Sequence, residues 1–186
     1  MSANLRREPA IRAVDRHDMG AFFAYLDDHL LDNGRDGAPL FQPMPRALSS
    51  FPPDKAAAFT RGLGIAVGEP GWRRAWVALT HDGILGHVDL RARPETGSSH
   101  RALLGMGVHR SARRQGLGAV LLQSALAWAQ RTTTLDWVDL EVLSANVPAR
   151  TLYQKTGFAV TGAIPDMFRI DGEALAYTLM SLRLQR

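Results

Sequence analysis

The sequence of 186 residues contains no cysteine. Disulfide bonds and a cysteine nucleophile are therefore excluded, because both require a thiol. The sequence also lacks any apolar run near the roughly 20 residues that a membrane-spanning helix needs. Residues 1–9 lack the apolar core of a secretory signal peptide. Together these absences predict a cytoplasmic protein that does not interact with a membrane.

Lysine is scarce, occurring only as Lys55 and Lys155, so arginine carries most of the net charge of +4. A basic excess can indicate a nucleic-acid-binding protein, but here the arginines are scattered among 18 acidic residues without a stripe or a known module. The sequence therefore predicts no nucleic-acid partner. Its hydrophobic content of 46% and its length are typical of one globular domain, here residues 1–186.

One dense basic cluster lies between a strand-like run, residues 102–108, and an alanine- and leucine-rich segment typical of a helix, residues 117–130. Its arginines and glycines are Arg110, Arg113, Arg114, Gly116 and Gly118. The first turn of a helix leaves backbone N–H groups unpaired and carries a partial positive charge. Arginines beside such a turn predict a binding site for phosphate or pyrophosphate.

Two well-known phosphate loops do not fit this cluster. A Walker loop needs a lysine and a hydroxyl residue after its glycines, and neither follows Gly116 or Gly118. The dinucleotide-binding fingerprint needs three spaced glycines that open a helix. Gly105 and Gly107 lie within the strand-like run instead, and Arg110 stands where the third glycine would be.

The segment Arg113-Arg-Gln-Gly116-Leu-Gly118 resembles the Gln/Arg-x-x-Gly-x-Gly/Ala signature of the GCN5-related N-acetyltransferase superfamily. A second block supports the resemblance. After the strand-like residues 138–142, the segment from Asn146 to Phe158 is similar to the family's Asn-x-x-Ala-x-x-Leu-Tyr-x-x-x-Gly-Phe pattern. The order and separation of the two blocks also fit, and the resemblance is specific over residues 103–158.

Periodicity and turn signals predict the remaining elements. The expected strands are residues 10–14, 75–80, 84–93, 158–164 with an extension to 170, and 174–184. The expected helices are residues 16–31, 54–63 and a segment that begins near 147. The Asp82-Gly83 and Asp171-Gly172 steps predict hairpins. The order β-α-α-β-β-β-α-β-α-β-β agrees with the family's α/β (α+β) fold, which is a mixed, mostly antiparallel sheet flanked by helices. The family's V-shaped splay between strands 4 and 5 is expected as well.

The resemblance implies that acetyl-CoA is the cosubstrate, and it implies no metal. The backbone of residues near the end of the fourth strand would pair with the pantetheine arm: Met106, Gly107 and Val108. The loop and the first turn of the helix would bind the pyrophosphate: Arg110, Arg113, Arg114, Gln115, Gly116, Leu117, Gly118 and Ala119. Asn146 would contact the CoA arm, but asparagine before Val147-Pro148 is also typical of a helix N-cap, and both roles can hold.

Tyr153 is the candidate general acid, since a hydroxyl with a pKa of about 10 can protonate the departing CoA thiolate. Its alternative role is aromatic packing. Five residues are candidates for the general base that deprotonates the acceptor, with a water relay as an alternative: Glu141, Asp139, His109, His87 and Asp89. We favour Glu141 because it lies on the fifth strand beside the expected cleft.

The sequence thus predicts an N-acetyltransferase that moves acetyl directly to a primary amine of a small molecule or a peptide. The absence of cysteine excludes an acetyl-cysteine intermediate. The alternative is a non-catalytic acyl-CoA-binding regulatory protein of the same fold. We expect residues 22–31, residues 41–53 and the last hairpin to wall the acceptor pocket. Family members commonly form homodimers, and the sequence indicates no interface.

Overall fold

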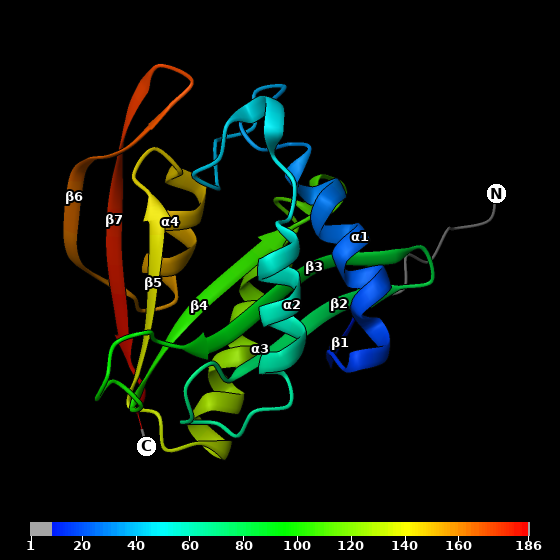
Figure 1. The fold of residues 1–186 in the computed structure, drawn as a ribbon, viewed down its shortest axis with the longest axis vertical. Coiled ribbons are helices and arrows are strands. Elements are labelled where there is room, and N and C mark those ends of the chain that lie inside the picture. The colour runs from blue at the N-terminus through cyan, green and yellow to red at the C-terminus, as the bar shows by residue number, and fades with distance from the viewer. Residues whose placement is uncertain (1–8, 186) are drawn as a thin grey trace.

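The computed structural model describes residues 9–185. Residues 1–9, which were predicted not to be a signal peptide, lie outside the described residues except for Pro9. The described chain forms a seven-stranded sheet in the order β1-β2-β3-β4-β5-β7-β6, flanked by four α-helices (Figure 1). The strands are β1 (Ala10–Ala13), β2 (Arg73–Thr80), β3 (Gly83–Ala92), β4 (Arg101–Val108), β5 (Trp137–Leu143), β6 (Ala159–Ile170) and β7 (Glu173–Arg183). The α-helices are α1 (Met19–Leu30), α2 (Pro53–Gly62), α3 (Leu117–Thr132) and α4 (Val147–Lys155).

The order of elements and the mixed sheet agree with the prediction. The Asp82-Gly83 and Asp171-Gly172 turns join β2 to β3 and β6 to β7, as expected. Gly83, Asp171 and Gly172 all have positive φ values, of 125°, 51° and 83°. Such values suit glycine and aspartate in tight hairpin turns, so local sequence chemistry places these turns.

The predicted helix over residues 16–31 divides into a short 3₁₀ turn, Arg16–Asp18, followed by α1. Two aspartates stabilise the 3₁₀ turn before α1. The Asp15 carboxylate accepts a hydrogen bond from the His17 amide, and the Asp18 carboxylate accepts one from the Asp15 amide. This reciprocal capping box fixes the first turn in a tighter form than the α-helix that follows.

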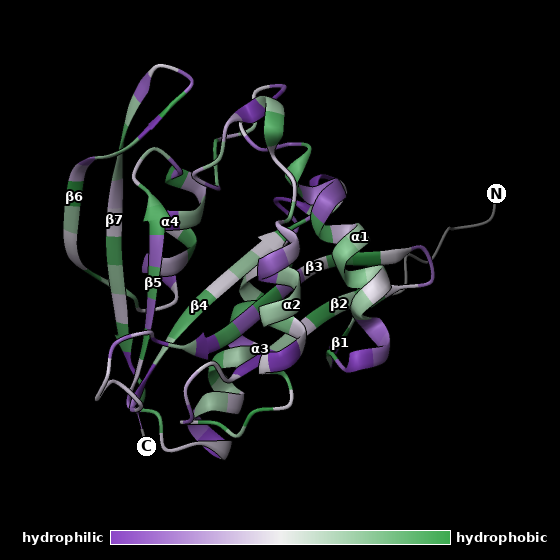
Figure 2. Ribbon diagram, viewed as in Figure 1, coloured by the Kyte–Doolittle hydropathy of each residue, from purple (hydrophilic) through white to green (hydrophobic). Residues whose placement is uncertain are grey.

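Helices cover both faces of the sheet at β2 and β3. Because side chains alternate along a strand, β2 directs Trp76 and Ala78 to one face and Ala75 and Val77 to the other. The first face packs against α3, and the second packs against α1 and α2, which lie in front of the strands in Figure 1. Hydrophobic residues accordingly lie along the central strands in Figure 2. Within residues 9–185, no helix is both long and apolar enough to span a membrane.

β4 and β5 are parallel neighbours, but they pair over only three residues. The pairs are Arg101 with Trp137, Ala102 with Val138 and Leu103 with Asp139. Both strands continue beyond the last pair, to Val108 and Leu143, and they diverge as they do so (Figure 1). The predicted splay between strands 4 and 5 is therefore confirmed.

Candidate active site

The loop before α3 offers a row of unpaired backbone donors. Within the described residues, the N–H groups from Arg114 to Gly118 make no hydrogen bond. Arg114 and Gly116 have positive φ values of 61° and 82°, and α3 has no side-chain cap at its start. Where residues in left-handed and right-handed backbone conformations alternate, successive N–H groups point toward one place and form a concave anion site. This geometry suits a phosphate group.

Two of the predicted phosphate-binding arginines already have carboxylate partners. Arg110 contacts Asp28 at 2.7 Å, and Arg113 contacts Asp32 at 2.7 Å. Both aspartates come from α1 and the turn after it, so these ion pairs join α1 to the loop. Arg114, in contrast, is exposed and makes no hydrogen bond or ion pair among residues 9–185. It is the guanidinium most available to a ligand at this site.

The two glycines of the loop have different structural roles. A Cβ atom on Gly116 would meet nothing within 4 Å, and its positive φ is the feature that favours glycine there. A Cβ on Gly118 would lie 3.1 Å from Cδ2 of Leu152. Gly118 therefore allows α3 to pack closely against α4, whereas Gly116 shapes the open surface of the loop.

Gly105 and Gly107 allow side chains from neighbouring elements to cross β4 on the face covered by α1 and α2. A Cβ on Gly105 would lie 2.6 Å from Oδ1 of Asp89 and 3.0 Å from Nη1 of Arg91. A Cβ on Gly107 would lie 2.5 Å from Nε2 of His29. The opposite face of β4 packs into the core through Met106 and Val108.

The sequence reasoning missed a buried polar cluster beside Gly107. The Tyr25 hydroxyl lies 3.1 Å from Nδ1 of His87 and 3.3 Å from the carbonyl oxygen of Gly107, to which it can donate. Burial lowers the pKa of His29 to about 3 and that of His87 to about 4. Both rings are therefore neutral at physiological pH. The only sequence signal for this cluster was the position of His29 and His87 among the apolar residues of α1 and β3.

Asn146 and Tyr153 both belong to the region of α4. The Asn146 side chain accepts a hydrogen bond of 3.3 Å from the Ala149 amide, so its N-cap role is confirmed. Tyr153 is 7% exposed, and its ring lies 5.9 Å from that of Phe158. Its hydroxyl makes no hydrogen bond with the described residues, and burial raises the pKa of Tyr153.

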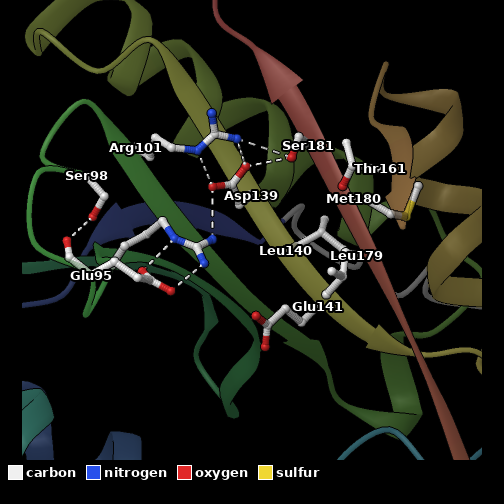
Figure 3. A pocket seen from close by; sticks show the side chains of 11 residues that line it. Glu95, Ser98, Arg101, Asp139, Leu140, Glu141, Thr161, Leu179, Met180 and Ser181 are labelled. Atoms are coloured by element: carbon white, nitrogen blue, oxygen red, sulfur yellow. Dashed lines mark hydrogen bonds and ion pairs between the residues drawn. The ribbon is translucent and has the colours of Figure 1, made fainter. Parts of the chain in front are cut away.

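The structure separates the five candidate bases by their partners. Asp139 accepts hydrogen bonds from Arg101, Arg93 and Ser181 (Figure 3). Three of the other four candidates also have partners. Asp89 lies between Arg73 and Arg91, His87 contacts Tyr25, and His109 contacts Asp28 and Ser111. Glu141 is exposed and makes no hydrogen bond or ion pair within residues 9–185.

Glu141 faces a hollow of about 470 Å³ on the sheet face opposite α3 (Figure 3). The hollow is lined by Arg93, Glu95, Ser98, Arg101, Asp139, Leu140, Glu141, Thr161, Leu179, Met180 and Ser181. The last hairpin contributes residues to this hollow, whereas residues 22–31 and 41–53 do not. The walls expected for the acceptor pocket stay a prediction.

The Asp139 carboxylate holds the narrow junction of β4 and β5 together, since three donors from three strands or their loops converge on it. Asp139→Asn leaves two guanidinium groups without their shared anion. Removing one partner of a buried ion pair costs several kcal/mol, and partial exposure of both arginines reduces this. We expect a loss of about 2–3 kcal/mol of unfolding free energy in urea denaturation. Asp82→Asn, at an exposed site, is the control and should change it by less than about 0.5 kcal/mol.

The same ion pairs predict a pH dependence. Burial acts to raise the pKa of Asp139, but hydrogen bonds from Arg101 and Ser181 and the nearby positive charges lower it overall. The stabilisation is therefore complete above the pKa of an unfolded aspartate, about 4, and is lost as pH falls through the lowered value. The difference between wild type and Asp139→Asn should shrink below pH 4. A difference that is constant with pH would show that the carboxylate charge is not what stabilises the junction.

Several solved acetyltransferase structures have the same overall fold as this chain. A GNAT-family acetyltransferase from Streptococcus pneumoniae matches with a TM-score of 0.78 and 22% identity, over 96% of this chain and 100% of that one. A ribosomal-protein-alanine N-acetyltransferase from Brucella melitensis matches with a TM-score of 0.74 and 18% identity, over 94% and 99%. A Salmonella typhimurium protein solved with its cofactor acetyl-CoA matches with a TM-score of 0.75 and 20% identity, over 97% and 96%.

At these identities the likeness establishes the acetyltransferase fold. The family follows from the sequence, because the model of the acetyltransferase (GNAT) family matches residues 44–158, more than half of the chain. The chain belongs to this family.

Proposed function

We propose that the protein is an acetyl-CoA-dependent N-acetyltransferase that acts directly on a primary amine. The observation that carries the proposal is the presence of three features: an open anion site before α3, a diverging pair of strands and, on the sheet face opposite α3, Glu141, a carboxylate without a partner among residues 9–185. The family is one of acetyltransferases, and a structural neighbour was solved with acetyl-CoA.

The residues present fit acetyl-CoA. The unpaired N–H groups from Arg114 to Gly118, together with the free guanidinium of Arg114, suit its pyrophosphate. Beyond Leu103, the edge of β4 that faces β5 has no strand partner, so the backbone of Met106 and Val108 is available to an extended ligand. Gly107 was also predicted for this role, but it lies opposite His87 on β3 and its carbonyl oxygen is within reach of the Tyr25 hydroxyl. Acetyl-CoA bound there supplies the acetyl group as a thioester. Asn146 remains a candidate contact for the CoA arm, in addition to its capping role.

Glu141 and Tyr153 would manage the protons. Glu141 takes one proton from the acceptor ammonium, because only the neutral amine is nucleophilic. As the new C–N bond forms and the C–S bond breaks, Tyr153 gives a proton to the departing sulfur. The nitrogen then loses its second proton, which restores the tyrosine. No thiol is available in the chain for an acetyl-enzyme, so transfer is direct.

Gly116→Val tests the anion site. The variant places a branched side chain at the open surface of the loop and opposes its positive φ, so we expect acetyl-CoA affinity to fall by about 1–3 kcal/mol, the value of lost charged hydrogen bonds. Isothermal titration calorimetry measures the change. Gly172→Val is the matched control, because Gly172 has nearly the same φ, 83° against 82°, and equally open surroundings. Wild-type affinity in a folded Gly116→Val protein would remove the loop from the acetyl-CoA site.

The alternative is a regulatory protein that binds acyl-CoA without turnover. A thiol-release screen distinguishes it from the proposed acetyltransferase. The proposal expects acetyl-CoA-dependent release of CoA with at least one primary amine between pH 6 and 10. Tight acetyl-CoA binding with no release for small amines, polyamines, amino acids or peptides would favour the regulatory protein.

A further inference from the structure

Within residues 9–185, the face of the sheet at the mouth of the splay carries one carboxylate without a partner and one positive charge in excess of its partner carboxylate. Leu103 and Asp139 form the last pair between β4 and β5. Because side chains alternate along strands, the next positions on the same face are Gly105 on β4 and Glu141 on β5. These two positions therefore flank the point where the strands part. That face is opposite the one on which Leu104 and Leu140 pack with α3.

The positive charge belongs to Arg91 on β3. Its Nη1 atom lies 3.0 Å from the place that a Cβ on Gly105 would occupy, so the guanidinium reaches across β4 to the mouth. Arg91 and Arg73 share one carboxylate, Asp89, at 3.2 and 3.5 Å, which leaves one positive charge in excess. Arg73 is covered further, because its guanidinium stacks on the ring of Phe59.

Arg91 also keeps most of its hydrogen-bonding capacity. It makes a single hydrogen bond in the described part of the chain, to Asp89, and its side chain is 34% exposed. Arg93, two residues along the strand direction, instead donates to both Glu95 oxygens and to Asp139. Arg91 therefore uses one of its five N–H donors and Arg93 uses three, so Arg91 keeps more of the planar donor set that suits a carboxylate or phosphonate.

The negative charge is Glu141, across the mouth. Arg91 lies over Gly105, and Gly105 and Glu141 are the first positions beyond the last β4–β5 pair on this face, so the two charges stand on either side of the parting strands. A single small molecule can therefore contact both. An ammonium group fits beside Glu141, and an anionic group of the same molecule fits beside Arg91.

We propose that the acceptor is a small amine that also carries an anionic group, of which an amino acid is the simplest example, and that Arg91 binds that group. This inference rests on the proposed function, in which Glu141 receives the acceptor amine. Arg91 is a specificity-determining residue in this arrangement, because it contacts the acceptor away from the reacting nitrogen.

The test compares acceptors of matched length. Glycine, β-alanine, 4-aminobutyrate and 5-aminovalerate are assayed beside ethylamine, propylamine, butylamine and pentylamine, with CoA release as the readout. The wild type should prefer one amino acid of the series, and the preferred length measures the span between Glu141 and Arg91. In Arg91→Gln, kcat/KM for that amino acid should fall about 10- to 100-fold, mainly through KM, as expected for lost charged hydrogen bonds. The alkylamines should change by less than about twofold, since uncharged chains gain nothing from the guanidinium.

Comparing each acceptor between wild type and variant cancels the intrinsic reactivity of its amine. Arg91→Lys should recover part of the loss, because it keeps the charge and loses the planar donors. Arg131→Gln, which removes one charge from α3 on the other side of the sheet, should change neither series. Equal use of amino acids and alkylamines by the wild type, or an equal loss for both in Arg91→Gln, would overturn the proposal and leave the enzyme intact. Release of CoA with no amine at all, despite acetyl-CoA binding, would overturn the proposed function together with this inference.

Discussion

Tyr153→Phe is expected to lower kcat about 10²–10³-fold, within the range for a lost general acid, and to leave acetyl-CoA affinity unchanged. The departing CoA thiolate would have to take its proton from water in this variant. The change removes only a hydroxyl that has no hydrogen-bond partner among the described residues. The ring keeps its contact with Phe158, and stability should therefore be preserved. Steady-state kinetics with an identified acceptor, together with a thermal melt, measures both effects.

The burial of Tyr153 makes this prediction sharp. A tyrosine that served only to pack the core would tolerate the loss of a hydroxyl without a partner among the described residues, and the variant would be as active and as stable as the wild type. Turnover within twofold of the wild type would therefore assign Tyr153 to packing. A reduced melting temperature with normal turnover would instead mean that the hydroxyl has a structural partner.

Glu141→Gln is expected to lower kcat/KM about 10²-fold at neutral pH, because proton transfer by a positioned side chain contributes at least that much. In the wild type, kcat/KM should rise with pH as the acceptor and its base lose their protons. Lysine-like amines have a pKa of about 10.4, so a variant that depends on free neutral amine should show the rise at higher pH. A pH–rate profile from 6 to 10 measures the displacement.

Two controls accompany this profile. Glu69→Gln removes an exposed carboxylate from the loop before β2 and should leave the profile in place. His109→Ala should also leave its pH dependence in place, because His109 is held by Asp28 at 2.8 Å and Ser111 at 2.7 Å. If His109→Ala shifted the rise of kcat/KM to higher pH and Glu141→Gln did not, the histidine would be the base.

Local signals account for what the sequence predicted of the fold. Asp82-Gly83 and Asp171-Gly172 mark hairpins because their backbone angles are set by the residues themselves. The strands and helices follow from periodicity within single segments. The start of α1 was placed three residues too early, because the capping box of Asp15 and Asp18 depends on side-chain hydrogen bonds that periodicity does not detect.

The site was harder to predict, because its chemistry depends on partners that are distant in sequence. Five residues competed for the role of base, and the sequence offered no means to see that Arg93 and Arg101 neutralise Asp139. The ion pairs from Arg110 and Arg113 to α1 span about 80 residues. Gly105 was noticed only as part of a failed fingerprint, and Gly107 also for its backbone, whereas the side chains of β3 and α1 that lie above them were not predicted.

The short pairing of β4 and β5 also affects how the protein avoids aggregation. Unpaired strand edges usually invite another chain to add to a sheet. Here two such edges, β4 beyond Leu103 and β5 beyond Asp139, lie within the sheet and face each other rather than solvent at large. A neighbouring molecule would have to thread a strand between them, whereas a slender flexible ligand can enter from the end. In the proposed function, the backbone groups that recognise acetyl-CoA therefore lie inside the sheet, where they offer no free edge to another chain.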